Sequence, residues 1–322
     1  MARNKLRIAL AGAGSFGREH LRELSAMGGI EVAGVADTNL AAAQAAATRY
    51  GAASAESDAV RMIERLRPDG FVIATPGHSH VALAIAALRL DIPVLLEKPV
   101  GLCAADAGVL IAAERKSTAF VLPGHILRFS NAYGEVAGII RAGEIGPVLS
   151  VSMRNHRDET HAVRYPGIDP VLMTMVHDID QALWITGAPL ASVLALRRPE
   201  NTARSETLIT GTGSSGCMWH ISNAWTFPTL EAPADRIEVV GEQGAVEMEL
   251  GRYIRVFGSK FREIELPLAA EDNMLRSELT YFTACIADGR KPEVVTLEDA
   301  RLGLVAADAI LESLRTGAVV RP

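Results

Sequence analysis

The sequence predicts an α/β protein in which a doubly wound parallel sheet is followed by an α+β domain with a large, mostly antiparallel, open-faced sheet. Up to about residue 125, short apolar runs alternate with helical stretches, which requires crossover connections and helices on both faces of a parallel sheet. From residue 192 to 266, apolar and polar residues alternate along runs separated by glycine-containing turns, as in antiparallel strands. We therefore expect two domains, residues 1–124 and 125–322, and the C-terminal helix could pack back on the first.

The elements of the first domain follow from this alternation. The strands are expected at the short apolar runs 6–11, 31–36, 69–75, 93–96 and 119–122. The intervening helices are expected at 15–27, 39–50, 80–89 and 104–116. The apolar run before the first glycines is too short for a signal peptide, and no apolar run reaches the roughly eighteen residues of a transmembrane helix.

The second domain mixes helices with alternating runs. Helices are expected at 132–141, near 273–288 and at 297–314, with an extended stretch at 148–154. Another helix should begin at Asp169-Pro170, where Asp can cap the first turn and Pro suits the first helical position. This helix should end at Gly187, and Thr296 should cap the last helix of the chain.

The composition excludes several classes of protein. Of 322 residues, 49% are hydrophobic and 22% are charged, so the chain can bury a core and long disorder is not expected. A net charge of −6 argues against binding to nucleic acid or to an anionic membrane. The three cysteines form no CxxC pair, which excludes a disulfide scaffold or zinc ribbon and favours a reducing, cytoplasmic location.

A glycine-rich turn follows the first predicted strand and reads Gly12-Ala13-Gly14-Ser15-Phe16-Gly17, the pattern GxGxxG. Between a strand and a helix, this pattern predicts a Rossmann dinucleotide site with the pyrophosphate at the helix N-terminus. Gly12 permits the tight turn, Gly14 lets the backbone approach the pyrophosphate, and Gly17 lets helix and strand pack closely. The alternative is a glycine turn with a purely structural role.

Asp37 ends the next predicted strand, twenty residues after Gly17. A carboxylate there can accept hydrogen bonds from the ribose hydroxyls and repels a 2′-phosphate. Thr38 and Asn39 follow it rather than a basic residue, so NAD is favoured over NADP. The alternative is that Asp37 caps the following helix.

Two further segments follow predicted parallel strands, at the edge where open α/β sheets bind ligands. They contain the remaining expected cofactor-site residues, which are Thr75, Pro76, His80, Glu97 and Lys98. The Lys98 ammonium could also hydrogen-bond a substrate oxygen and stabilise an alkoxide. Lys98 alone would equally fit a solvated strand end.

In order and spacing, these motifs together resemble the Gfo/Idh/MocA oxidoreductase family over essentially the whole chain. The motifs that carry the resemblance are GxGxxG with Asp37, TPGHSH at 75–80, EKP at 97–99, Arg128-Phe129, Gly143-Glu144-Ile145-Gly146 and His177-Asp178-Ile179-Asp180. The resemblance implies NAD(P)-linked oxidation or reduction of a sugar, cyclitol or related polyol. It places EKP and the histidine helix on either side of the nicotinamide, and it implies homodimers or homotetramers built through the open face of the second sheet.

The histidine helix departs from the family at one position. The family's dehydrogenases commonly have Asp four residues before the histidine, whereas this chain has Met173. On an α-helix, 173, 177, 180 and 184 form one stripe, which we assign to the cleft, and 172, 176, 179 and 183 form another, which we assign to the core. His177 is expected to exchange the hydroxyl proton, with Asp180 orienting it or binding a substrate hydroxyl. The alternative is a histidine satisfied within the core.

Arg128 and His156 also occupy positions that resemble substrate contacts of the family. For His156, an exposed loop histidine is an equal alternative. No HExxH-type spacing occurs, so no metal site is expected.

Two functions remain open from the sequence. The first is an NAD-dependent dehydrogenase acting on CH–OH groups, with Lys98, His177 and Asp180 as catalytic residues. The second is an NAD-binding sensor or ligand-binding module that has lost the dehydrogenase activity, as Met173 could indicate.

Overall fold

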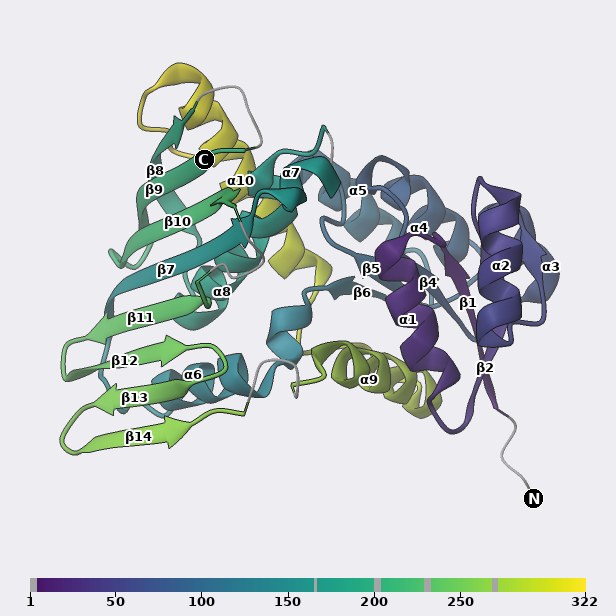
Figure 1. Ribbon diagram of the computed structural model, residues 1–322, viewed down its shortest axis with the longest axis horizontal. Helices are drawn as coiled ribbons and strands as arrows, with labels where there is room; N and C mark the ends of the chain where they lie inside the picture. Colours follow the sequence, from purple (N-terminus) through teal and green to yellow (C-terminus); the bar gives the residue numbers. More distant parts are fainter. Residues whose placement is uncertain (1–4, 165–166, 200–203, 229–232, 268–271) are drawn as a thin grey trace. The chain divides into compact units, whose positions relative to one another are not determined.

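The computed structural model describes residues 5–164, 167–199, 204–228, 233–267 and 272–322 (Figure 1). The chain forms two compact units. The first contains residues 1–126 and 274–301, and the second contains 127–273 and 302–322. Residues 274–301 thus belong to the first unit, whereas the sequence placed them in the second domain and allowed only the C-terminal helix to pack back on the first. Within the described ranges, every helix is too short or too polar to cross a lipid bilayer.

The first unit is built on a six-stranded sheet in the order β3-β2-β1-β4-β5-β6. Its strands are β1 (Leu6–Ala11), β2 (Ile30–Ala36), β3 (Ala55–Glu56), β4 (Gly70–Ile73), β5 (Val94–Glu97) and β6 (Val121–Gly124). All neighbouring strands pair in parallel, which confirms the predicted doubly wound sheet. The β4 and β5 strands are buried along their whole length, as expected when helices cover both faces.

Helices cover this sheet in two groups. They are α1 (Ser15–Ser25), α2 (Leu40–Tyr50), α3 (Ala59–Leu66), α4 (His80–Leu88), α5 (Ala104–Glu114) and α9 (Met274–Asp288). The α1 helix contacts α2 and α9, whereas α3, α4 and α5 contact one another in succession. The sequence analysis missed α3, although Asp58 caps it by accepting hydrogen bonds from the Val60 and Arg61 N–H groups.

The second unit contains an eight-stranded sheet in the order β14-β13-β12-β11-β7-β10-β9-β8 (Figure 1). Its strands are β7 (Val148–Asp158), β8 (Leu190–Arg198), β9 (Glu206–Gly213), β10 (Met218–Phe227), β11 (Arg236–Gly241), β12 (Gly244–Glu249), β13 (Tyr253–Phe257) and β14 (Phe261–Glu265). The β7 and β10 strands pair in parallel, and the other neighbours are antiparallel. The expected mostly antiparallel sheet is confirmed.

The helices of the second unit are α6 (Asn131–Arg141), α7 (Thr160–Arg164), α8 (Val176–Thr186) and most of α10 (Leu297–Thr316). The predicted helix between Asp169 and Gly187 is not a uniform α-helix. It opens with a π-helical turn, Val171–Met175, and continues as α8 until Gly187, whose φ of 62° ends it. As expected, the Asp169 carboxylate accepts a hydrogen bond from the N–H of Val171, at 2.8 Å.

The two faces of the second sheet differ. On β7, Val151, Met153 and Asn155 are buried, whereas Ser152 and Arg154 between them are partly exposed. The buried face is the one that carries the helices, because on β10 the Trp225 indole donates a hydrogen bond to Thr174 of the π-helical turn. The opposite face has exposed apolar side chains at Leu196, Leu208, Met218, Phe257 and Phe261.

Candidate functional site

The glycine turn at the carboxyl end of β1 has the geometry that a dinucleotide needs. Gly12 adopts φ +101°, a backbone conformation that favours glycine, and a Cβ on Gly17 would lie 1.7 Å from the Gly12 carbonyl oxygen. A Cβ on Gly14, in contrast, would meet no atom within 4 Å. Gly12 and Gly17 are therefore required by the fold, whereas Gly14 leaves open space beside the backbone, where a pyrophosphate can approach.

The N-terminus of α1 supports the same interpretation. Gly14 occupies the cap position and has no side chain to bond the first N–H groups of the helix, which begins at Ser15. Ser15 and Phe16 are exposed there. Backbone donors at the positive end of a helix dipole form an anion-binding site, so these residues fit a dinucleotide phosphate.

Asp37 lies beside this turn rather than at a helix cap. Its Oδ2 accepts a hydrogen bond from the N–H of Ala13 at 2.7 Å, and its Oδ1 accepts one from the N–H of Asn39 at 2.8 Å. The cap of α2 is Asn39, whose side chain accepts from the N–H of Ala42. The alternative role of Asp37 as the cap is therefore wrong. A carboxylate has further lone pairs, which can accept the ribose hydroxyls.

His80 holds the two strand ends together instead of facing a ligand. Its side chain is 1% exposed, with Nε2 2.7 Å from the Thr75 carbonyl oxygen and Nδ1 2.8 Å from that of Pro99. Burial lowers the pKa of His80, so the ring is neutral at neutral pH and donates to one of these carbonyls at a time. The His80 ring thus joins the segments after β4 and β5, and a cofactor contact at this residue stays a prediction.

Glu97 and Lys98 lie in different surroundings although they are neighbours. The Glu97 carboxylate is buried, contacts His20 and accepts a hydrogen bond from the Lys98 backbone N–H. This side chain points into the unit, so a direct cofactor contact is not what its geometry provides. Lys98 is partly exposed, as are Thr75 and, to a greater degree, Pro76.

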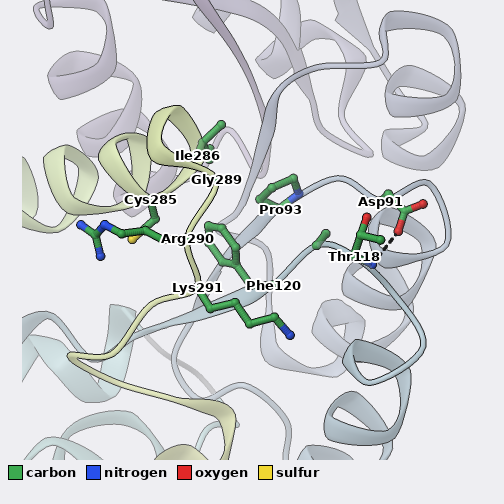
Figure 2. Close-up of a pocket in the computed structure, with 10 residues that line it drawn as sticks. Asp91, Pro93, Thr118, Phe120, Cys285, Ile286, Gly289, Arg290 and Lys291 are labelled. Carbon is green, nitrogen blue, oxygen red and sulfur yellow. Dashed lines mark hydrogen bonds between the residues drawn. The ribbon is translucent and has the colours of Figure 1, made fainter.

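A surface hollow of about 130 Å³ lies elsewhere on the first unit (Figure 2). Asp91 and Pro93 before β5 and Thr118 before β6 line it, together with Arg290 and Lys291 after α9. These residues precede the strands, so the hollow is at the amino edge of the sheet, opposite the glycine turn. It contains none of the predicted site residues.

In the second unit, the structure brings Arg128 and Asp180 together. The Arg128 Nε donates to Asp180 Oδ2 at 3.0 Å and the Nη2 donates to Oδ1 at 2.7 Å, and both side chains are almost fully buried. The Arg128 guanidinium also lies 5.6 Å from the ring centre of Trp184. This bidentate ion pair joins the turn before α6 to α8. Asp180 lies about one helical turn after His177 on that helix.

The predicted stripes on the histidine helix hold except at Asp180. The core residues Leu172, Val176, Ile179 and Leu183 are buried as expected, and His177 is partly exposed. Asp180, which was assigned to the cleft, is 2% exposed. Met173 lies in the π-helical turn, so the regular α-helical spacing assumed between 173 and 177 does not apply.

A buried polar network anchors α8 to the sheet, and the sequence analysis missed it. The Asp178 carboxyl, next to His177, is hydrogen-bonded by Asn155 of β7. Burial, and then the charge of Asp235, raise the pKa of Asp178 well above its usual value, which favours the protonated form of this carboxyl. Arg157 donates to both carboxylate oxygens of Asp235, at 2.6 and 2.9 Å. The network fixes which face of α8 meets the sheet.

His156 is not brought together with His177. It follows the buried Asn155 on β7, so its side chain lies on the opposite, open face of the sheet. There its Nε2 is 2.8 Å from the Ser222 hydroxyl, which donates to Glu206, and its ring stacks on Phe227. The expected substrate contact at His156 is therefore not supported within one chain. Among the described residues, no cluster of His, Cys, Asp or Glu could hold a metal ion.

Two glycine variants distinguish the glycine that folding requires from the glycine that cofactor binding requires. We expect Gly14→Ala to leave the melting temperature unchanged, because its Cβ meets open space, but to weaken NADH binding about tenfold or more by blocking the pyrophosphate. Gly17→Ala should lower the melting temperature, because its Cβ collides with the Gly12 carbonyl. NADH fluorescence titration and thermal unfolding measure the two effects. NADH binding to Gly14→Ala at wild-type affinity would contradict the binding of the pyrophosphate at the glycine turn.

A second pair of variants tests the network behind α8. The folded-state pKa of Asp178 is raised, so the wild-type protein loses stability as pH rises above the unfolded value of about 4, whereas Asp178→Asn does not. Urea unfolding should therefore show Asp178→Asn gaining stability relative to wild type from about pH 4 to 8. Asp235→Asn should instead cost roughly 1–3 kcal/mol, because it weakens the two-point pair with Arg157. Equal losses in both variants would show that Asp178 is ionised.

Comparison with known proteins gives the family. A model described as "Oxidoreductase family, NAD-binding Rossmann fold" matches residues 6–125, and one described as "GFO/IDH/MocA C-terminal domain" matches 133–247. Inositol 2-dehydrogenase 4 of Saccharopolyspora erythraea is 30% identical over 215 residues, which are 65% of this chain and 62% of that protein. The matched region thus spans less than two thirds of that relative.

Two further similarities cover nearly the whole chain. Inositol 2-dehydrogenase of Salmonella typhimurium is 26% identical over 97% of this chain and 95% of its own length. The fold is also that of an oxidoreductase from Agrobacterium radiobacter, solved in complex with NAD+, L-tartaric acid and magnesium, with a TM-score of 0.88, 18% identity and 98% coverage of both chains. The chain belongs to the Gfo/Idh/MocA family of oxidoreductases, and its amino-terminal part is the family's NAD-binding Rossmann domain.

Proposed function

We propose that this protein is an NAD-dependent dehydrogenase that interconverts a hydroxyl and a keto group on a cyclitol, a sugar or a related polyol. One observation carries the proposal. The glycine turn, Thr75 and Lys98 follow the neighbouring parallel strands β1, β4 and β5, so all three lie at the same edge of one sheet. This edge therefore offers a dinucleotide cradle and, two strands away, a partly exposed amine.

The roles of the residues follow from their chemistry. NAD, when bound, supplies the acceptor for a hydride from the substrate carbon. The Lys98 ammonium donates a hydrogen bond to the substrate oxygen and stabilises negative charge that develops there. His177 accepts the hydroxyl proton, or returns it in the reverse direction. Asp180, fixed by Arg128, orients His177 or a substrate hydroxyl, and Arg128 offers donors to hydroxyl or carboxylate groups.

The similar proteins narrow the substrate class. Both relatives named above are inositol 2-dehydrogenases, which makes myo-inositol the first candidate to test. A ring with several hydroxyls offers both donors and acceptors, which suits the hydrogen-bonding chemistry of a lysine ammonium and an imidazole.

An NAD-binding sensor without turnover is the second candidate, because Met173 stands where the family's dehydrogenases commonly have Asp. A hydrophobic side chain there cannot orient an imidazole or stabilise its cation. The presence of both Lys98 and His177 favours the enzyme.

The open face of the second sheet suggests how the chain assembles. Leu196 pairs with Leu208 across β8 and β9, and Phe257 with Phe261 across β13 and β14, and all four side chains are exposed. The two pairs lie near opposite edges of the sheet, and exposed apolar side chains on one face commonly mark association sites. A homodimer or homotetramer formed through this face is therefore part of the proposal.

The decisive experiment combines a substrate panel with a lysine variant. We expect reduction of NAD with at least one of myo-inositol, other cyclitols, hexoses and polyols, followed by absorbance of NADH. Lys98→Ala should lower kcat about 10²–10³-fold, because a charge-stabilising donor is lost, while the Kd of NADH changes by less than about threefold.

The control is Lys116→Ala, which removes an exposed lysine just beyond α5. Its kcat should equal that of the wild type. NADH binding without turnover of any panel member would favour the sensor, and full turnover by Lys98→Ala would remove Lys98 from the mechanism.

A further inference from the structure

Three titratable side chains form a buried cluster in the first unit, next to Lys98. They are His20 on α1, Glu97 at the end of β5 and Glu278 on α9, with exposed fractions of 0%, 5% and 0%. Ionisable side chains are seldom buried so completely unless they have partners or a function. The roles proposed above for Lys98 and the cofactor use none of these side chains directly.

Glu97 is held from two sides. Its Oε1 lies 2.7 Å from His20 Nε2, and its Oε2 accepts the backbone N–H of Lys98 at 3.2 Å. His20 in turn packs edge-on against the ring of Phe16, with 5.1 Å between the ring centres. One imidazole therefore contacts both the glycine turn and the carboxylate that binds the Lys98 backbone.

The neighbouring strand leaves room for this carboxylate. A Cβ on Gly124 of β6 would lie 3.1 Å from the Cα and from the carboxyl group of Glu97. That distance is tighter than ordinary van der Waals contact, so any larger residue would press on Glu97. The position of Glu97 is thus constrained by α1, by its own strand and by β6.

Glu278 differs from Glu97 in its surroundings. Neither of its carboxyl oxygens has a hydrogen-bond partner among the described side chains and backbone. Burial raises the pKa of Glu278 well above its usual value, and the nearby charge of Glu97 raises it further. Elsewhere on these two helices, Glu23 of α1 forms an ion pair with Arg276 of α9 at 2.8 Å and a second one with Arg22. The cluster therefore contains two acids in different surroundings, because Glu97 is hydrogen-bonded whereas Glu278 is buried with a raised pKa.

We propose that Glu97, held in place by His20, is the positioning residue for Lys98. The Glu97 carboxylate accepts the Lys98 backbone N–H and so fixes the position of the Lys98 backbone. A displacement of about 1 Å at a reacting group can lower the rate on the order of 10²-fold. The inference rests on the role proposed above for Lys98. The alternative is that the cluster only stabilises the packing of α9 on the unit.

The first test separates positioning from packing. His20→Phe keeps an aromatic ring against Phe16 and removes the hydrogen bond to Glu97. Leu21→Ala, a fully buried neighbour on α1, is the matched control for lost stability. We expect His20→Phe to lower kcat at least about tenfold with little change in the Kd of NADH, whereas Leu21→Ala lowers only the melting temperature.

A double-mutant cycle shows whether the effect passes through Lys98. In the Lys98→Ala background, His20→Phe should cause no further loss of kcat, because the residue that it positions is absent. An equal loss in both backgrounds, or a wild-type kcat in the single variant, would overturn the proposal. Glu97→Gln, which keeps the shape and one acceptor, replaces His20→Phe if that variant does not fold.

The second test needs no turnover. Trace acetylation with acetic anhydride, read by peptide mass spectrometry, reports the reactivity of Lys98 relative to Lys116 in the same molecule. We expect this ratio to change at least about threefold in His20→Phe and Glu97→Gln and to stay constant in Leu21→Ala. An unchanged ratio would overturn the positioning role. If no polyol is oxidised, the dehydrogenase fails but this measurement still decides the inference.

Glu278→Gln tests the raised pKa of Glu278. An amide replaces the carboxyl at almost constant shape and cannot ionise, so this variant should melt at the same or a higher temperature than the wild type near neutral pH. A melting temperature lower by more than roughly 4 °C would show that an ionised Glu278 stabilises the unit and would contradict the raised pKa.

Discussion

The parallel pairing of β1, β4 and β5 is the constraint on which the candidate site depends. Parallel strands end at the same edge, so the glycine turn, the Thr75 segment and Lys98 meet there although more than eighty residues separate the first from the last. His80 then ties the ends of β4 and β5 by facing the carbonyls of Thr75 and Pro99. The sheet thus sets the separation of the cradle and the amine, and the buried imidazole holds it.

In each unit a buried acidic side chain lies next to a segment that contains a candidate catalytic residue. Asp178 is next to His177 on α8, and Glu278 is next to the carboxylate that binds the Lys98 backbone. Burying a carboxyl disfavours its charged form, so the pKa of each acid is raised. Each acid thus lies against a candidate functional segment with its protonated form favoured.

The sequence predicted what depends on local pattern. GxGxxG with Asp37, the apolar strands and the caps at Asp169 and Thr296 are readable because a few neighbouring residues determine them. What failed depends on tertiary context. Whether His156 faces the helices or the open side depends on the register of β7, and the burial of His80 and Glu97 depends on the strands and helices packed around them. The two-residue β3 and the π-helical turn are too short to leave a periodic signal.

The charges around α8 bear on what Met173 changes. An aspartate at this position would add a carboxylate four residues before His177 and stabilise its protonated form. Of the carboxyls that remain on the helix, Asp178 has a raised pKa and Asp180 forms a two-point pair with Arg128. Met173 therefore removes a carboxylate that could orient the His177 ring, and this loss is the argument for the sensor as the second candidate.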